Sequence, residues 1–162
     1  MPNYQRPKIN GAIVFFTVTL ANRQSTALTD NINALRQAVR ATKAERPFGI
    51  EAWVVLPDHL HCIWRLPEDD HDYSTRWRLI KSRFARAVPK GNLRQSHIAR
   101  GERGVWQRRF WEHHIRSDAD FEAHLRYCWL NPVKHGFVER PEDWVYSSVH
   151  RDARYIGCGS GA

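Results

Sequence analysis

The sequence predicts an α+β fold of the ferredoxin-like, split β-α-β type, with an antiparallel central sheet and helices on one side. The first observation behind this prediction is the order of hydrophobic patterns, which runs strand, helix, strand, strand, helix, strand, helix. The second is that only Pro57 and Asp58 separate the second and third strands, as in a tight hairpin. The 162 residues suit a single domain, which we place at 1–150, followed by an irregular tail at 151–162.

The first half of the chain supplies three strands and one helix. Residues 12–20 (AIVFFTVTL) are rich in β-branched and aromatic side chains, which predicts a buried strand. Residues 50–56 and 59–66 predict the two strands of the hairpin, and we expect the second of these to lie centrally in the sheet. A helix is expected at 28–45, where apolar side chains recur at helical spacing, at Leu28, Ile32, Leu35 and Val39.

The second half supplies two helices and the last strand. A basic amphipathic helix is expected at 74–88 and a strand at 105–116 (VWQRRFWEHHIR). The last helix is expected at 118–130. Its end is set by Pro132, which disfavours helical geometry at the preceding Asn131.

The charge and the cysteines limit the classes of function. The formal net charge is +8 and the isoelectric point about 9.9, which favours a polyanionic partner, nucleic acid before membrane. The three cysteines are scattered and form no CxxC pair, so neither a disulfide framework nor a structural zinc knuckle is expected. We find no run of about 18 apolar residues and no secretory signal, and we expect a protein of the reducing cytoplasm.

His59 and His61 are the residues from which the functional prediction starts. Side chains alternate across a strand, so these two imidazoles share one face of the third strand. Two imidazoles placed in this way can bind a single metal ion, although an isolated His-x-His is more often structural or incidental. A third ligand has to come from another element, and we expect it from the last helix.

Tyr127 and Asn131 are four residues apart in that helix and are therefore neighbours on one face. Asn131 could add a carbonyl oxygen to the metal and leave open positions for phosphate oxygens. A tyrosine hydroxyl, with an ordinary pKa of about 10, is a poor nucleophile when free. Beside a metal-polarised phosphodiester it can attack in line, forming a phosphotyrosine and releasing a 3′-hydroxyl. Taken alone, Tyr127 is more often a surface residue and Asn131 a helix-end residue, so the prediction depends on their joint occurrence.

Basic side chains predict the surface that contacts nucleic acid. No acidic residue occurs between Tyr73 and Gly101, and cationic side chains cover the helix predicted there. In the strand at 105–116, basic and aromatic residues interleave, as a surface for single strands requires. The plainer interpretations are a solvated basic helix, an edge strand with a wet face and a solvated helix histidine. The residues predicted to bind DNA are Arg76, Arg78, Lys81, Arg83, Arg108, Arg109 and His124.

Five segments, in this order, closely resemble the REP-associated tyrosine transposases, which are bacterial relatives of the insertion-sequence transposases of the HUH class. The segments are LPDHLH, STRWRLIKSRF, RGERGVWQRRFWEHHIR, DFEAHLRYCWLNPVKHG and DWVYSS, and the likeness covers about residues 4–150. The resemblance implies an HUH nuclease domain with Tyr127 as the nucleophile. It also implies that His59, His61 and Asn131 hold Mg²⁺ or Mn²⁺, with Asn131 where insertion-sequence relatives usually carry Gln.

The activity implied by the resemblance is that of a metal-dependent single-stranded DNA endonuclease and strand transferase. Such an enzyme cleaves and rejoins DNA at the hairpins of repetitive extragenic palindromes (REP) through a covalent 5′-phosphotyrosine. The resemblance further implies a bacterial, cytoplasmic, nucleoid-associated protein that acts as a monomer or homodimer and has no membrane partner.

Two other functions fit parts of the sequence. A ferredoxin-like sheet can hold RNA or DNA without cutting it, which would require base-stacking aromatics and no joint use of the histidine pair and Tyr127. A water-using metallohydrolase would take Glu112 or His114 as its third ligand in place of Asn131. A Tyr127→Phe substitution separates these possibilities, because it should abolish cleavage only in the transposase.

Overall fold

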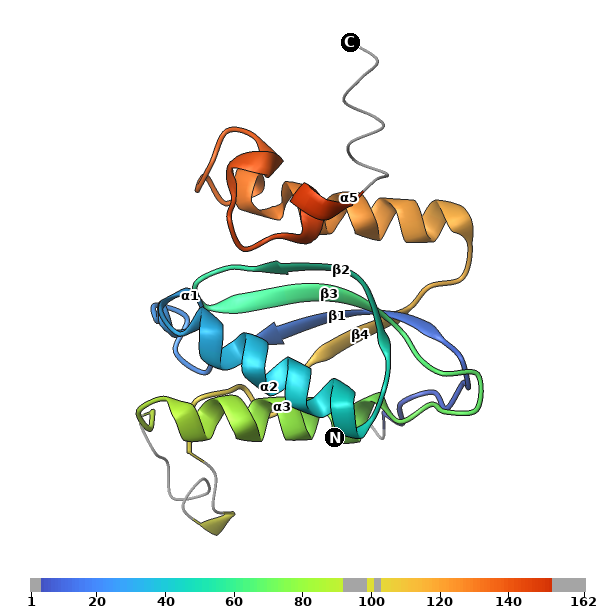
Figure 1. Ribbon diagram of the computed structural model, residues 1–162, viewed down its shortest axis with the longest axis horizontal. Coiled ribbons are helices and arrows are strands. Elements are labelled where there is room, and N and C mark those ends of the chain that lie inside the picture. Colours follow the sequence, from blue (N-terminus) through green and yellow to red (C-terminus); the bar gives the residue numbers. More distant parts are fainter. Residues whose placement is uncertain (1–3, 92–98, 101–102, 153–162) are drawn as a thin grey trace.

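A computed structural model of the protein describes residues 4–91, 99–100 and 103–152, and within these residues four antiparallel strands form one sheet. The strands are β1 (Ile13–Thr19), β2 (Gly49–Val55), β3 (His59–Arg65) and β4 (Trp111–His114). Their order is β2-β3-β1-β4, with β2 and β3 joined as a hairpin. This order confirms the predicted α+β, split β-α-β fold and the central position of β3 (Figure 1). Residues 153–162 of the predicted tail lie outside the described residues.

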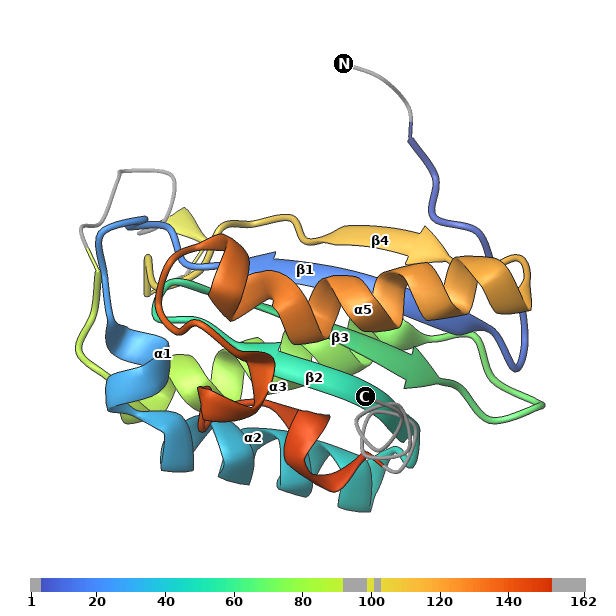
Figure 2. The same ribbon diagram turned by 90° about the horizontal axis from the view of Figure 1, so that it is seen from above.

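Helices cover both faces of this sheet, whereas the sequence led us to expect them on one side. The covering helices are α2 (Ile32–Glu45), α3 (Tyr73–Ala87) and α5 (Asp118–Lys134). α2 and α3 pack on one face, and α5 packs on the other face, against β2 and β3 (Figure 1, Figure 2). Phe16 and Trp64 join the core under α2 and α3, whereas Phe15 and Ile63 join a second core under α5. The central strands therefore carry apolar side chains on both faces, and each face has to be covered.

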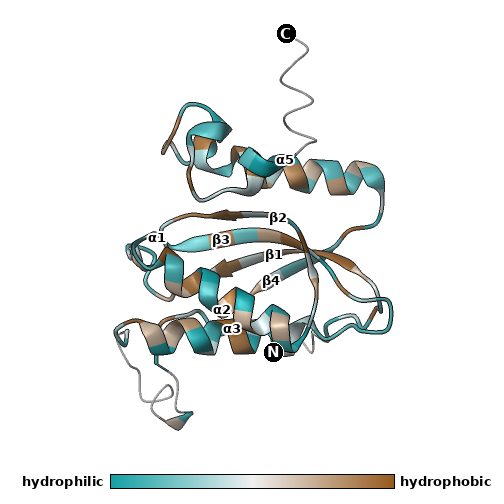
Figure 3. Ribbon diagram, in the orientation of Figure 1, coloured by the Kyte–Doolittle hydropathy of each residue, from teal (hydrophilic) through white to brown (hydrophobic). Residues whose placement is uncertain are grey.

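α2 and α3 are amphipathic, and Figure 3 shows hydrophilic and hydrophobic residues alternating along both. The helix that we predicted at 28–45 is divided at Asn31 into α1 (Ala27–Asp30) and α2. The Asn31 side-chain amide donates to the Ala27 carbonyl oxygen at 2.9 Å. A side-chain bond of this kind competes with regular helical hydrogen bonding, which explains the interruption.

α5 runs through Pro132 to Lys134, so the predicted end at Asn131 is wrong. Pro132 lacks the N–H that would continue the helical ladder, but its side chain is buried on the inner face of α5, and this packing outweighs the lost hydrogen bond. After Lys134 the chain leaves the helix in a turn at Gly136, whose φ of 77° lies in the left-handed region. The Gly136 N–H donates to the Val133 carbonyl and the Phe137 N–H to the Pro132 carbonyl, which is a Schellman motif.

β4 is shorter than the strand predicted at 105–116. Before Trp111, the segment makes a single isolated bridge, between Trp106 and Leu20. The Lys81 ammonium on α3 donates to the carbonyl oxygens of Gln107 and Arg108, at 2.7 and 3.3 Å. These carbonyl groups therefore bond to α3, which ties α3 to the entrance of β4.

The segment after α5 lies along the outer edge of β2 (Figure 2). It contains two short 3₁₀ helices, η1 (Pro141–Asp143) and η2 (Ser148–Arg151). The Val55 N–H donates to the Tyr146 carbonyl at 2.8 Å, and the Trp144 indole donates to the Val55 carbonyl at 2.9 Å. This cover satisfies an edge that would otherwise expose unpaired backbone groups. None of the helices described is long and apolar enough to cross a membrane.

Candidate active site

The predicted histidine pair lies on the face of the sheet that α5 covers. His61 on β3 pairs with Thr17 on β1, and Thr17 pairs with Trp111 on β4. Residues that pair directly across antiparallel strands point to the same face. His61, Thr17 and Trp111 therefore form one row across the sheet, beneath or beside α5.

Both histidines are buried, with 6% of His59 and 3% of His61 exposed, and both are held by their Nδ1 atoms. His59 Nδ1 is 2.8 Å from a carboxylate oxygen of Asp58, and His61 Nδ1 is 2.8 Å from the Thr17 hydroxyl oxygen. The imidazole rings are 5.0 Å apart. A partner at Nδ1 fixes the orientation of a metal-binding histidine and leaves Nε2 for the ion. His61 Nε2 is buried without a hydrogen-bond partner among the described residues.

Asn131 on α5 presents the second unsatisfied group. Its side chain is 1% exposed, and neither its amide nitrogen nor its amide oxygen has a hydrogen-bond partner among the described residues. A buried polar group left unpaired costs about 1–3 kcal/mol. An unpaired amide oxygen and an unpaired imidazole nitrogen are also donors that a metal ion uses. The residues present thus fit a dication, and two imidazoles with one amide oxygen suit Mn²⁺ better than Mg²⁺.

Burial, together with the smaller effects of the neighbouring His59, His135 and Lys134, lowers the pKa of His61 to about 3. His61 is therefore neutral at physiological pH. A neutral imidazole is the form that binds a metal ion.

Tyr127 lies at the edge of this buried group and is 39% exposed. Its ring is 5.1 Å from the His61 ring and 5.8 Å from the Phe15 ring, measured between centroids. The Lys134 ammonium is 5.2 Å from the centre of the Tyr127 ring, and the His135 ring is 5.3 Å from the His59 ring. The phenol is thus accessible, while its neighbours are a histidine of the pair and a cation.

Lys134 and His135 were not predicted as site residues, because the predicted helix stopped before them. The continuation of α5 through Pro132 places both beside the histidine pair. The orienting roles of Asp58 and Thr17 were also missed. The role of Asp58 could have been predicted, because this residue directly precedes the first histidine. The role of Thr17 could not, because it depends on the strand register.

The structure separates the predicted DNA-binding residues into three groups. Arg76 is 1% exposed, so the prediction that it contacts DNA is wrong. Arg83 donates to Thr42 and Glu45, and the Lys81 ammonium bonds to backbone carbonyls. Arg78, Arg108 and Arg109 are exposed.

The buried Arg76 guanidinium bonds within the protein and does not face solvent. It donates to the carbonyl oxygens of Arg46, Pro47 and Asp72 and to the carboxylate of Asp70.

Glu112 and His114 point away from the histidine pair, which overturns the metallohydrolase ligand set. Glu112 pairs with Phe16, whose side chain lies in the core of the opposite face. The Glu112 carboxylate accepts from the Tyr4 hydroxyl at 2.7 Å and from the Arg6 guanidinium. His114 lies on that same opposite face, 5.8 Å from the ring of Tyr73.

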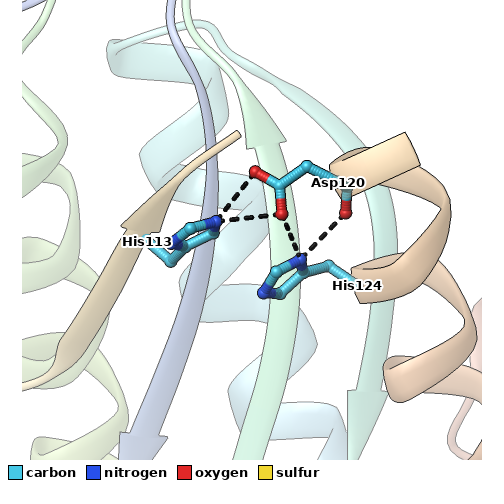
Figure 4. A group of neighbouring side chains, drawn as sticks. All are labelled: His113, Asp120 and His124. Carbon is cyan, nitrogen blue, oxygen red and sulfur yellow. Dashed lines mark hydrogen bonds and ion pairs between the residues drawn. The ribbon is translucent and has the colours of Figure 1, made fainter. Parts of the chain in front are cut away.

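His124, predicted to bind DNA, belongs to a separate cluster with His113 and Asp120 (Figure 4). His113 projects from β4, and the other two residues lie four apart on α5. Among the described residues, these three bring His, Cys, Asp or Glu ligand atoms within 4.8 Å of one another. The i, i+4 spacing of Asp120 and His124 was visible in the sequence, but the approach of His113 depends on the packing of β4 against α5.

The fold and the site define a ferredoxin-like α+β protein in which a buried histidine pair faces a tyrosine carried on a helix. No family model matches the chain. Over 152 residues it is 48% identical to the REP-associated tyrosine transposase of Escherichia coli (strain K12), which covers 94% of this chain and 85% of that protein. A relative from Haemophilus influenzae is 46% identical over 157 residues, covering 95% of this chain and 89% of the relative.

A solved structure agrees with these relatives. It is that of a REP-associated tyrosine transposase bound to a REP hairpin, with a TM-score of 0.81 and 47% identity, covering 95% of this chain and 86% of that one. The chain therefore belongs to the family of REP-associated tyrosine transposases, which confirms the resemblance found in its sequence.

Proposed function

We propose that this protein is a metal-dependent single-stranded DNA endonuclease and strand transferase that acts at REP hairpins through a covalent 5′-phosphotyrosine. The observation that carries the proposal is the pair of unsatisfied buried groups, His61 Nε2 and the Asn131 amide, next to the accessible Tyr127. An imidazole nitrogen and an amide oxygen are both atoms that bind a metal ion, and both lie here next to the same tyrosine. Family membership and the hairpin bound to a relative support the choice of substrate.

The residues that would hold the ion are His59, His61 and Asn131. A bound Mg²⁺ or Mn²⁺ would polarise the phosphodiester as a Lewis acid. The chain prepares this site before the ion arrives, because Asp58 and Thr17 fix both imidazoles and burial keeps His61 neutral. Tyr127 is 39% exposed and lies beside His61, so a phosphate that reaches the tyrosine also reaches this site.

Tyr127 supplies the nucleophile. Its hydroxyl oxygen forms a bond to phosphorus and gives up its proton to solvent, while the bond from phosphorus to the 3′-oxygen breaks. The leaving 3′-oxygen takes up a proton and becomes a hydroxyl. The phosphotyrosine keeps the energy of the phosphodiester, so a 3′-hydroxyl can later attack it and rejoin the strand. Lys134, over the tyrosine ring, is placed to pair with the phosphate.

We place the DNA strand across the β4 edge of the sheet. Trp111 on β4 is 67% exposed and occupies the same row as His61, two strands away. Neighbouring strands are about 4.8 Å apart, so the backbone of Trp111 lies about 10 Å from that of His61, a span of one or two nucleotides. Exposed aromatic rings stack on bases without regard to sequence. The exposed Arg108 and Arg109 precede β4 and can contact the phosphates of the same strand.

A denaturing gel tests the proposal. The protein is incubated with an end-labelled single-stranded REP hairpin, with Mn²⁺ or with chelator. We expect a product linked to the protein that requires Mn²⁺ and disappears in Tyr127→Phe. Tyr146→Phe, which alters a tyrosine at the β2 edge, is the matched control and should retain the product. Cleavage without linkage would point to a hydrolase, and a native-gel shift without cleavage would point to a binding module; either result would overturn the proposal.

A further inference from the structure

The cluster of His113, Asp120 and His124 has no part in the reaction proposed above. His113 Nε2 is 2.9 and 3.1 Å from the two carboxylate oxygens of Asp120. His124 Nδ1 is 3.0 Å from one of the same oxygens, and the two imidazole rings stack with their centroids 4.5 Å apart. Figure 4 shows the two rings converging on one carboxylate, one from β4 and one from α5.

We propose that these three side chains form a second metal site, which takes a dication of the Zn²⁺ class. Two imidazole nitrogens and one carboxylate oxygen are the three protein ligands of an open zinc site. Zinc bonds of about 2.0–2.2 Å, at mutual angles of about 90–109°, place ligand atoms about 3.0–3.5 Å apart. The nitrogen-to-oxygen separations in the cluster, 2.9–3.1 Å, are at the lower end of this range, so the ion needs only small side-chain shifts.

The surroundings of the cluster suit an ion that exchanges with solvent. The exposed fraction of the three side chains lies between 21% and 32%, so an ion can enter without opening the core, and water can fill its remaining positions. The Arg116 backbone N–H donates to Asp120 at 2.9 Å, which orients the carboxylate.

The competing interpretation is a clamp held by hydrogen bonds alone, in which each imidazole donates an N–H to Asp120. The two interpretations differ in the position of a proton. An ion requires the lone pair of each facing nitrogen, so the proton of each neutral ring has to move to the opposite nitrogen. His124 Nδ1 also lies 2.9 Å from the Asp120 backbone carbonyl oxygen, which can only accept, so the ion form requires this contact to open as well. Metal binding decides between the two forms.

Phe15 separates this cluster from the histidine pair. Its ring is 4.8 Å from the His124 ring on one side and 5.6 Å from the His61 ring on the other. Two-metal phosphoryl-transfer sites need ions about 3.5–4 Å apart, and an intervening aromatic ring excludes that distance. The second ion would therefore act on structure: it would tie β4 to α5, one helical turn before Tyr127.

Zinc titration of protein freed of metal by chelation tests this inference independently of DNA cleavage. We expect calorimetry to give two Zn²⁺ per wild-type chain. The double variant His59→Ala/His61→Ala should bind one, and addition of Asp120→Asn to that variant should abolish binding. Asp118→Asn in the same background is the matched control, since Asp118 also lies in the first turn of α5 but outside the cluster, and it should leave one Zn²⁺ bound.

Folding has to be followed in the same variants, because Asp120 also bonds to the Arg116 backbone. Zn²⁺ should raise the unfolding temperature of the double variant and have no effect once Asp120 is replaced. A double variant that binds no Zn²⁺ would overturn the inference, as would binding that survives Asp120→Asn. Wild-type protein that binds one Zn²⁺, lost with Asp120→Asn, would support this cluster and count against the histidine-pair site instead.

Discussion

At the scale of single residues, the Thr17 hydroxyl is expected to control metal affinity without touching the ion. It holds His61 Nδ1 at 2.8 Å, and replacing such a partner commonly lowers metal affinity about 10–100-fold. Thr17→Val keeps the shape of the side chain and removes the hydroxyl. We therefore expect Mn²⁺ affinity, measured by calorimetry, to fall by about this factor while the fold is retained.

Thr19→Val is the control for that substitution. Thr19 lies on the same strand and pairs with His59, so the same change of shape is made on the same face of the sheet, in the neighbouring row. Equal losses of affinity in the two variants would show that strand packing, and not the hydroxyl bonded to His61, sets metal affinity.

His61 also predicts a dependence of stability on pH. Burial lowers its pKa in the folded protein to about 3, whereas an unfolded histidine has a pKa of about 6.5. Between these values the unfolded chain binds a proton that the folded chain does not. The contribution to stability is therefore complete above about pH 6.5 and is lost as the pH falls toward 3, by up to about 1.4 kcal/mol per pH unit.

Urea unfolding in chelator at pH 7 and pH 5 measures this contribution. As the pH is lowered from 7 to 5, the free energy of unfolding should decrease more in wild type than in His61→Gln, whatever the absolute stability of the variant. His150→Gln, an exposed histidine outside the site, controls for the loss of a histidine. Parallel pH curves for wild type and His61→Gln would contradict the prediction.

At the scale of elements, α5 shows where local sequence rules give way. The rule that a proline ends a helix failed, because Pro132 is buried against a face of the sheet that we expected to be uncovered. Lys134 and His135 reach the site only through this continuation. The position of Tyr127 and Asn131 on one face of the helix was predictable from their spacing alone, because residues four apart are neighbours whether or not the helix continues. The burial of Asn131 was not, because it depends on the sheet below.

β4 predicts an energetic role for an exposed aromatic side chain. Trp111 is 67% exposed in the row of His61, and stacking of a base on an aromatic ring is worth about 1–3 kcal/mol. We expect Trp111→Ala to weaken hairpin binding by about 5- to 150-fold and Trp111→Phe to restore most of it, as measured by fluorescence anisotropy. Val145→Ala, at a position 69% exposed near the β2 edge, is the control. Equal binding by Trp111→Ala and wild type would show that the DNA strand does not cross the β4 edge.

At the scale of the whole molecule, the strand order was predictable because every strand has its own apolar pattern and the hairpin fixes the pairing of β2 with β3. The two-sided cover was not predicted. The side chains of β1 that fill the second core, such as Phe15, are of the same kind as those of the first, such as Phe16, so the pattern shows burial without showing what covers each face. The same uncertainty made Arg76 look like a surface cation, when it is a buried side chain that bonds to Pro47 before β2 and to Asp70 and Asp72 before α3.

The distribution of positive charge over the molecule provides the last prediction, because two basic surfaces are candidates for the proposed contact with the hairpin. One is the β4 edge, with the exposed Arg108 and Arg109. The other is a groove of about 850 Å³ between α2 and β2, to which Arg36 and Arg40 contribute. Each phosphate contact adds about 0.7–0.9 to the slope of log affinity against log salt concentration. We expect Arg108→Ala/Arg109→Ala to reduce the slope by about 1.4–1.8.

Arg36→Ala/Arg40→Ala removes the same number of charges from the groove, so both double variants lower the net charge equally. If the strand crosses the β4 edge, the groove variant should keep the wild-type slope, and both slopes are measured by anisotropy over a range of KCl concentrations. A reduced slope in the groove variant alone would place the hairpin on α2. Equal, small reductions in both would mean that the overall charge attracts the DNA and neither surface contacts it directly, since a diffuse field acts without regard to position.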